Sequence, residues 1–228
     1  MAEVATGVTG RIRPRQFHET VGLEDWRVVG EGACTYFRTG SFAAGARLVQ
    51  AISELTGLDD HHPGVDLRYG GVLVRLITVT DDYYGLTERD VDLAGQISAA
   101  ARELGLPADP SAVQNVQVSI DAVAIPEVLP FWRAVLGYTE RGDSPEEDLI
   151  DPRGRGPLIW FQQMDGPRPQ RNRIHFDLWV PYEQVEARIA AALAAGGRLV
   201  TDEYAPSWWV LADAEGNEVC VATTTSRD

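Results

Sequence analysis

The stretch GLDDHHPGVDLRYGGVLVRLITVT, residues 57–80, carries the pattern that decides the fold. Its second part alternates apolar and polar residues as a strand does, and Gly70-Gly71 divides that part into a predicted hairpin. Before the stretch, residues 41–58 have apolar side chains at helical spacing. After it, residues 86–106 form a second amphipathic helical pattern. The stretch therefore predicts two strands between two helices.

The N-terminal half is expected to be an α+β fold, an antiparallel sheet with helices on one face. Residues 26–40 add two short strands upstream of the first helix. Ser41 and Thr87 are the predicted N-caps of the two helices. Glu88 and Asp90 place negative charge at the positive end of the second helix dipole.

A domain boundary is predicted at GLPADPSA, residues 105–112, because prolines, a glycine and an aspartate interrupt the periodic segments there. The expected organisation is a solvated tail, a first domain, a linker and a second domain. These segments are residues 1–14, 15–106, 107–112 and 113–228.

The second domain repeats one order of elements. A strand, a helix and a strand are predicted first, and then a strand, a helix and a hairpin. Neither unit can bury its sheet face alone, so the two are expected to close on each other. The predicted segments are 113–124, 125–138 and 156–164, and then 173–180, 181–197 and 207–223.

Composition excludes several classes of function. The formal net charge of −14 repels phosphate backbones and anionic membranes, so neither nucleic acid nor membrane is an expected partner. No apolar run reaches the roughly 18–20 residues of a membrane span, and no signal peptide is evident. Cys34 and Cys220 share no motif spacing and are expected to be free thiols. A cytoplasmic protein is expected.

The first candidate site is DDHHPG, residues 59–64, which holds two of the four histidines of the chain. Pro63 biases His62 towards extended geometry, which helps to splay the two imidazoles apart. Asp59 and Asp60 can orient or charge an imidazole. Loss of water from a carbon that bears nitrogen needs an acid for the hydroxide and a base for the N–H proton, and paired histidines suit both tasks. The alternative is that the pair caps a helix or faces solvent.

The motifs GLDDHHPGVDLRY (57–69) and GLTERDVDLA (85–94) resemble the pterin-4a-carbinolamine dehydratase family. The resemblance covers roughly residues 15–105. It implies dehydration of 4a-hydroxytetrahydropterin without a metal or other cofactor. By this resemblance His61 and His62 are the catalytic pair. The residues expected to contact substrate are Asp60, Pro63, Tyr69 and Asp90.

The sequence departs from that family at the third histidine, which follows a threonine near the end of the last strand. Counting forward from Pro63 puts Val79 at that position, and counting back from Gly85 puts Asp81 there. About two residues are therefore inserted between the two motifs. Asp81 is the expected substitute base, and the alternative is that DDYYG, residues 81–85, is an acidic turn.

The second candidate site lies in the C-terminal half. FWRAVLGY (131–138), NRIHFDL and DAEGNEVCV resemble the glyoxalase/bleomycin-resistance, or vicinal oxygen chelate, superfamily. The resemblance implies paired βαβββ modules over roughly residues 113–225. His175 and Glu218 are candidate ligands of a divalent metal, and Gln117 and Gln162 are weaker candidates in the first repeat. The alternative, which the pattern favours, is a hydrogen-bonded strand histidine and a turn carboxylate.

Three functions are consistent with the sequence. The first is a dehydratase centred on the histidine pair, acting on a small pterin-like carbinolamine. The second is a small-molecule binding or resistance protein that uses the C-terminal cup. The third is a metal-dependent lyase or dioxygenase in the same cup. Resemblance to both families implies a homo-oligomer, a dimer or tetramer.

Overall fold

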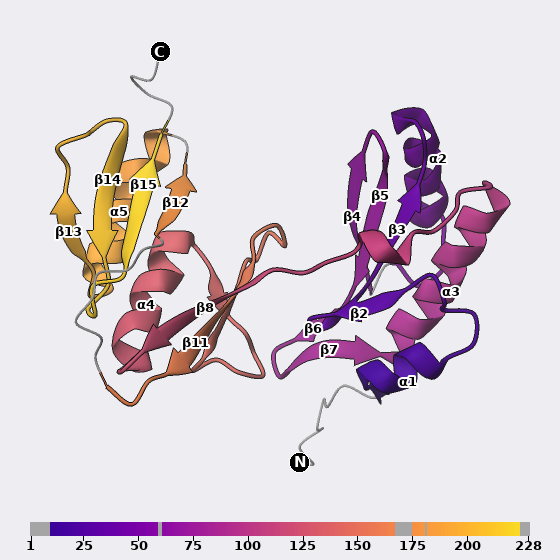
Figure 1. Ribbon diagram of the computed structural model, residues 1–228, viewed down its shortest axis with the longest axis horizontal. Helices are drawn as coiled ribbons and strands as arrows, with labels where there is room; N and C mark the ends of the chain where they lie inside the picture. The colour runs from indigo at the N-terminus through magenta and orange to yellow at the C-terminus, as the bar shows by residue number, and fades with distance from the viewer. Residues whose placement is uncertain (1–9, 59–60, 167–174, 181, 224–228) are drawn as a thin grey trace, which may run out of the picture. The chain divides into compact units, whose positions relative to one another are not determined.

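The computed structural model describes residues 10–58, 61–166, 175–180 and 182–223. The chain divides into two compact units, residues 1–115 and 116–228, and each is described here by itself (Figure 1). Both units mix helices with sheets, as the α+β prediction requires.

The first unit is built on a four-stranded antiparallel sheet in the order β2-β3-β5-β4. The predicted hairpin is confirmed, because β4 pairs with β5 from Gly64↔Arg75 to Arg68↔Gly71 without a register shift. Gly71 needs the absence of a side chain, since a Cβ there would lie 2.3 Å from the Tyr36 ring. The strands are β2 Arg27–Val29, β3 Gly32–Arg38, β4 Gly64–Arg68 and β5 Gly71–Leu76.

Two helices, α2 Phe42–Ser53 and α3 Glu88–Glu103, pack against each other, and α2 also packs on β4 and β5 (Figure 1). Both predicted N-caps are confirmed. The Ser41 hydroxyl accepts a hydrogen bond from the Ala44 N–H at 3.2 Å, and Thr87 precedes α3. Residues buried between helices and sheet include Trp26, Phe37, Leu48, Val74, Leu76 and Ile97.

A smaller sheet, in the order β1-β7-β6, completes the first unit. The prediction of a solvated tail up to residue 14 is wrong for its last residues. β1 (Arg11–Ile12) pairs with Thr87 and Leu86 of β7 (Tyr83–Thr87), and α1 (Pro14–Glu19) buries Phe17. These elements are too short for sequence periodicity to reveal them. The third strand is β6, Thr78–Thr80.

The segment expected to be a linker belongs to the first unit. Arg38 donates its N–H to the Pro107 carbonyl at 2.9 Å, and Asp109 donates its N–H to the Tyr36 carbonyl at 2.7 Å. Ala108 forms a bridge with Phe37 between these two bonds. Residues 107–109 therefore extend the sheet beside β3 before a 3-10 turn at Pro110–Ala112.

The second unit contains two βαβββ modules with the same topology, which confirms the internal repeat. The sheet orders are β8-β11-β10-β9 and β12-β15-β14-β13, and in each sheet the first and fourth strands of the module are parallel neighbours. The first module contains β8 Gln117–Ala122, α4 Ile125–Leu136, β9 Thr139–Glu140, β10 Asp148–Ile150 and β11 Leu158–Gln163. The second contains β12 Phe176–Trp179, α5 Val185–Ala194, β13 Arg198–Thr201, β14 Trp208–Ala212 and β15 Glu218–Ala222.

Strand alternation divides each of these sheets into a buried and an outer face. In the second module, Phe176 and Leu178 of β12 and Val219 and Val221 of β15 pack into the core with α4 and α5. Asp177 and the other residues between them therefore lie on the outer face of the sheet.

A buried carboxylate joins the two modules. Asp213, in the turn after β14, is fully buried and accepts a hydrogen bond from the Trp132 indole of α4 at 2.9 Å. It also accepts hydrogen bonds from Asn217 and from the Glu215 N–H. Glu215 in turn accepts the N–H groups of Val123 and Ala124 at the start of α4.

Asp151 organises the loop between β10 and β11. Its side chain is only 6% exposed. Burial alone would raise the pKa of Asp151, but hydrogen bonds from Arg153, Gly156 and Arg155 outweigh burial and lower that pKa to about 2. The loop is therefore held by an ionised carboxylate.

Within the described residues, no helix combines the length and apolar character needed to cross a membrane.

Candidate active site

The centre of the first candidate site is a buried pair, His61 and Asp90. The His61 Nε2 lies 2.8 Å from the Asp90 Oδ1, and the two side chains are 10% and 0% exposed. His61 comes from the connection between α2 and β4, whereas Asp90 lies in the first turn of α3. The fold therefore brings together the two motifs that carry the family resemblance.

Asp90 is held by donors on two further elements. Its Oδ2 accepts hydrogen bonds from the Thr87 N–H at 2.7 Å, the Thr87 hydroxyl at 3.0 Å and the Thr78 hydroxyl at 2.8 Å. Three donors therefore converge on one oxygen of a fully buried side chain, which fixes its position. Asp90, which the resemblance predicts to contact substrate, is a hydrogen-bond partner of His61, and its contacts with Thr87 also cap helix α3.

The hydrogen-bond partners fix which ring nitrogen of each neutral histidine carries the proton. A carboxylate and a carbonyl accept hydrogen bonds, so His61 donates from Nε2 to Asp90. By the same reasoning His62 donates from Nδ1 to the Leu58 carbonyl at 2.5 Å. The two imidazoles therefore have partners on different segments, Asp90 of α3 for His61 and the Leu58 carbonyl for His62. His61 Nδ1 and His62 Nε2 are the nitrogens that remain to exchange protons with a substrate.

His61 lies at the wall of a cleft of about 340 Å³. This volume falls within the roughly 300–1,000 Å³ of small-molecule sites. The Thr56 hydroxyl donates to the Gln96 amide oxygen at 3.1 Å, which joins the end of α2 to α3 across the cleft. The lining is mostly polar and comprises Thr56, Gly57, His61, Arg89, Asp92, Leu93 and Gln96.

The other residues predicted to contact substrate do not all lie near the His61–Asp90 pair. Pro63 is half-buried and directly precedes β4. Tyr69 is 75% exposed at the other end of β4. The five residues of β4 lie between Tyr69 and Pro63, which places the two roughly 20 Å apart. Tyr69 therefore does not share a pocket with the histidines. Asp60 lies outside the described residues.

The structure also explains why the two counts to the third histidine position differ. The β4–β5 hairpin has a continuous register, so the forward count from Pro63 to Val79 holds. Strands β6 and β7 pair up to Thr80↔Tyr83, which leaves Asp81 and Asp82 as the turn between them. The two inserted residues therefore extend this hairpin.

This arrangement weakens the case for Asp81 as a substitute base. Asp81 is exposed at the hairpin turn. The hydroxyl that reaches Asp90 belongs to Thr78. Asp81 lies three residues beyond Thr78, which corresponds to about 10 Å along the chain. Val79 is 51% exposed. Asp81 and Asp82 therefore form the acidic turn that was the alternative prediction, whereas residues 83–85 belong to strand β7.

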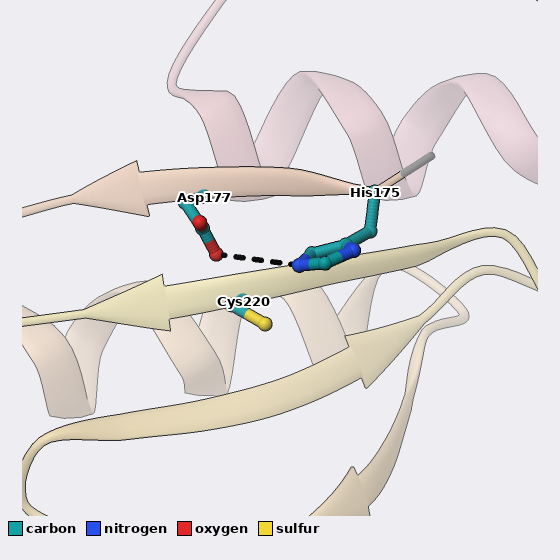
Figure 2. A group of neighbouring side chains, drawn as sticks. All are labelled: His175, Asp177 and Cys220. Atoms are coloured by element: carbon teal, nitrogen blue, oxygen red, sulfur yellow. Dashed lines mark ion pairs between the residues drawn. The ribbon is translucent and has the colours of Figure 1, made fainter. Parts of the chain in front are cut away.

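The second candidate site differs from its predicted composition. An imidazole nitrogen of His175, a carboxylate oxygen of Asp177 and the Cys220 thiol sulfur all lie within 4.8 Å of one another (Figure 2). Cys220 pairs in register with Asp177 on the neighbouring parallel strand. Glu218, the predicted second ligand, lies two residues before Cys220 on the same strand.

Strand register separates the two predicted ligands of the first module. Gln162 pairs with Asp121 between β8 and β11, whereas Gln117 pairs with Leu158, which lies four residues before Gln162 on β11. The two amides therefore lie at opposite ends of this strand pair.

The Cys220 thiol is held in its protonated form. Burial, the negative charge of Asp177, a hydrogen bond with Asp177 and the negative charge of Glu218 raise the pKa of Cys220 to about 11. At neutral pH this thiol is therefore not a nucleophile, because the thiolate is the reactive form.

Sequence reasoning missed Thr78 and Cys220 as members of these sites, and it did not choose Asp177 as a metal ligand. A signal for Asp177 and Cys220 was present, since residues two apart on a strand share a face. Asp177 follows His175 by two positions, and Cys220 follows Glu218 by two. Thr78 carries no comparable signal, because its contact with Asp90 depends on how β6 packs on α3.

Comparisons with known proteins match each unit separately. A family model described as pterin 4 alpha carbinolamine dehydratase matches residues 11–100, and one described as a glyoxalase-like domain matches residues 117–222. A protein of Acidobacterium capsulatum named as a pterin-4-alpha-carbinolamine dehydratase is 36% identical over 90 residues, which are 39% of this chain and 96% of that protein. A relative of the same name from Nocardia farcinica is 38% identical over 35% of this chain and 82% of its own length.

Two solved structures that resemble the chain each cover less than half of it. A transcriptional coactivator/pterin dehydratase from Brucella melitensis has 25% sequence identity, covering 40% of this chain and 99% of its own, with a TM-score of 0.36. A glyoxalase/bleomycin resistance protein/dioxygenase family enzyme from Burkholderia phytofirmans PsJN has 22% identity, covering 47% of this chain and 95% of its own, with a TM-score of 0.35.

Proposed function

Since the chain belongs to the pterin-4a-carbinolamine dehydratase family through residues 11–100, we propose that its first unit dehydrates 4a-hydroxytetrahydropterin or a similar cyclic carbinolamine. The observation that carries the proposal is the His61–Asp90 pair beside the cleft. A buried carboxylate that orients an imidazole is an arrangement suited to proton transfer.

The reaction needs one proton donor and one proton acceptor. The bond between the carbinol carbon and its hydroxyl oxygen breaks, and a proton from an imidazolium lets that oxygen leave as water. The proton on the neighbouring ring nitrogen passes to a neutral imidazole, and a carbon–nitrogen double bond forms. The protons balance, so the pair returns to its starting state after one proton passes between the two rings through solvent.

We assign His61 as the base and His62 as the acid. When His61 Nδ1 takes up a proton, the ring becomes an imidazolium that the ionised Asp90 stabilises through Nε2. His62 is exposed and is anchored only through Nδ1 to the Leu58 carbonyl among its described contacts. That exposure lets His62 exchange protons with water between turnovers.

The cleft offers groups that suit the polar edge of a pterin. Such an edge presents N–H donors beside a carbonyl acceptor. Asp92 can accept from the donors, and Arg89 or the Gln96 amide can donate to the carbonyl. These three residues lie on α3, the helix whose first turn also holds Asp90. One helix would thus position both the substrate and the base.

The rate of dehydration, followed by absorbance, tests this assignment. The comparison uses the full chain, His61→Ala, His62→Ala and the control His18→Ala, which removes an imidazole from α1 of the same unit. The proposal expects each site variant to lose about 10²–10⁴-fold in rate, with the control unchanged. Equal rates for His61→Ala and the full chain would contradict it.

A second candidate function is binding of such a compound without turnover. The observation that favours it is Val79, whose hydrocarbon side chain cannot exchange a proton at the third histidine position. Under this function the full chain would bind a stable pterin in the cleft but would not exceed the uncatalysed rate of dehydration. Binding and rate, measured on one sample, separate the two functions.

A further inference from the structure

The hairpin of β6 and β7 carries a phenol beside the position where the family has its third histidine. Val79 occupies that position on β6, and Tyr84 of β7 is its direct partner in the strand register. Side chains directly opposite each other in an antiparallel pair project from the same face, with Cβ atoms about 4.5–5.5 Å apart. We propose that Tyr84 takes over the role of this histidine, as a hydrogen-bond donor to the hydroxyl group that leaves the substrate. This inference rests on the proposed function of the first unit.

Strand β6 connects the Val79–Tyr84 pair to the buried histidine. Thr78 directly precedes Val79, and its hydroxyl donates a hydrogen bond to the Asp90 carboxylate at 2.8 Å. Asp90 in turn accepts the hydrogen bond of His61. The Val79–Tyr84 pair is therefore one residue removed along β6 from the contacts that hold His61.

Arg75 of β5 holds the hydroxyl group of Tyr84. Its Nη2 donates to the Tyr84 oxygen at 3.3 Å, and both side chains are half-buried. The guanidinium lies over Gly32 of β3, where a Cβ would lie 2.8 Å from the Arg75 Nε. Arg75 is also in register with Gly64, the last residue of DDHHPG, where a Cβ would lie 3.9 Å from the Arg75 Cβ. The arginine therefore connects the phenol to the end of the histidine motif.

The contact with Arg75 also sets the direction of the hydroxyl hydrogen. A guanidinium can only donate, so the phenol oxygen of Tyr84 accepts from it and directs its own hydrogen elsewhere. A donor aimed at the hydroxyl oxygen of a carbinolamine stabilises the negative charge that grows there as the carbon–oxygen bond breaks. The proton that lets this oxygen leave as water still comes from His62, so the proton balance of the reaction is unchanged.

The neighbouring side chains of the DDYYG segment are engaged elsewhere. Tyr83 donates its hydroxyl to the Leu86 carbonyl at 2.6 Å, and its ring lies 4.5 Å from the Arg11 guanidinium carbon. Asp82 forms an ion pair with Arg11 at 3.6 Å. Because successive strand residues project to opposite faces, Tyr83 and Tyr84 point to different sides of β7. Of the two tyrosines, Tyr84 is therefore the one that shares a face with the third-histidine position.

Dehydration kinetics of the full chain and its variants test the role of Tyr84. Tyr84→Phe should lower kcat by about 10²-fold, the usual effect of removing one such donor. It should lower kcat/KM equally, because the donor acts on charge that develops only in the transition state. The control Tyr36→Phe removes a phenol from β3 of the same unit and should change neither constant.

A histidine at residue 79 provides the rescue. Adding Val79→His to Tyr84→Phe returns an acid/base group to the third-histidine position and should recover at least about tenfold in kcat. A purely structural role of Tyr84 predicts no recovery, because this change does not rebuild the contact between phenol and guanidinium. Arg75→Met should lower kcat in the full chain but not further in Tyr84→Phe, since Arg75 is a positioning residue that acts through the phenol.

The outcomes separate this inference from the proposed function. An unchanged kcat in Tyr84→Phe, together with a loss in His61→Ala, would overturn the role of Tyr84 and leave the dehydratase assignment in place. Lack of recovery when Val79→His is added to Tyr84→Phe would also overturn that role. A full chain that does not exceed the uncatalysed rate would overturn both.

Discussion

Replacing Asp90 with asparagine separates the structural role of this residue from its effect on His61. The carboxylate accepts four hydrogen bonds, three of them at Oδ2. An asparagine oxygen at the Oδ2 position can keep the contacts with Thr78 and Thr87. Its NH₂ group then faces His61 Nε2, which can accept a hydrogen bond only if the imidazole proton moves to Nδ1. The nitrogen assigned as the base would no longer be available.

The expected magnitudes follow from this exchange. Loss of one hydrogen bond to a charged group reduces the free energy of unfolding by about 2 kcal/mol. Loss of the oriented base lowers the dehydration rate by about 10²–10⁴-fold. Asp90→Asn should therefore remain folded but turn over slowly. Glu88→Gln, which removes the other acidic side chain of the first turn of α3, should leave the rate unchanged.

The assay combines rates with nitrogen NMR of the His61 ring, which reports its tautomer directly. In a His61→Ala background, Asp90→Asn should reduce the rate little further, because a residue that acts through its partner shows strong coupling in a double-mutant cycle. A rate for Asp90→Asn within about threefold of the unmodified chain would refute the reasoning, since the tautomer change should cost far more. Full additivity of the two changes would also refute it.

Four further changes test other features of the two units. Asp81→Asn should leave the dehydration rate within about twofold, because the side chain lies at an exposed turn, and a loss near 10²-fold would instead identify it as a base. Val79→His should raise that rate at least about tenfold by adding an acid/base group, and an unchanged rate would show that the third position does not contact the substrate. Asp213→Ala should lower the free energy of unfolding, measured by urea denaturation, by about 3 kcal/mol, because the buried Trp132 indole loses its acceptor and the turn loses its hydrogen bonds from Glu215 and Asn217; a loss under about 1 kcal/mol would contradict this. Asp151→Asn should lower the free energy of unfolding by about 2 kcal/mol at neutral pH. Because the folded pKa of Asp151 is lowered to about 2 from 3.8, its contribution is present above pH 4 and is lost as pH falls towards 2, so the variant and the unmodified chain should converge in acid.

Sequence reasoning succeeded where local chemistry determines the structure. Ser41 and Thr87 were predicted as N-caps because a hydroxyl can satisfy the first N–H groups of a helix, and both precede helices in the structure. The Gly70-Gly71 hairpin and the end of α4 at Gly137 were also predicted from a local signal, a glycine at a turn or at the end of a helix. Gly137 adopts a φ of 66°, which glycine tolerates best.

It failed where contacts join distant segments. The contact between His61 and Asp90 was not predicted, because the two residues lie 29 positions apart in the sequence. Cys220 meets Asp177 only because two strands become parallel neighbours around α5 and the β13–β14 hairpin. Such a register cannot be deduced from the spacing of residues along the chain. The short elements β1 and α1 were missed because two to six residues show no periodicity.

The pairing of β1 with β7 sets a limit on how the dehydratase-like unit can be shortened. A fragment that begins at residue 15, the predicted start of the first domain, would lack Arg11 and Ile12. Those residues pair with Thr87 and Leu86, and Thr87 supplies two of the hydrogen bonds that hold Asp90. Removing them would expose the edge of β7 next to the carboxylate that orients His61. The minimal working fragment therefore begins before Arg11, and an affinity tag is better placed ahead of this strand with a spacer than fused directly to it.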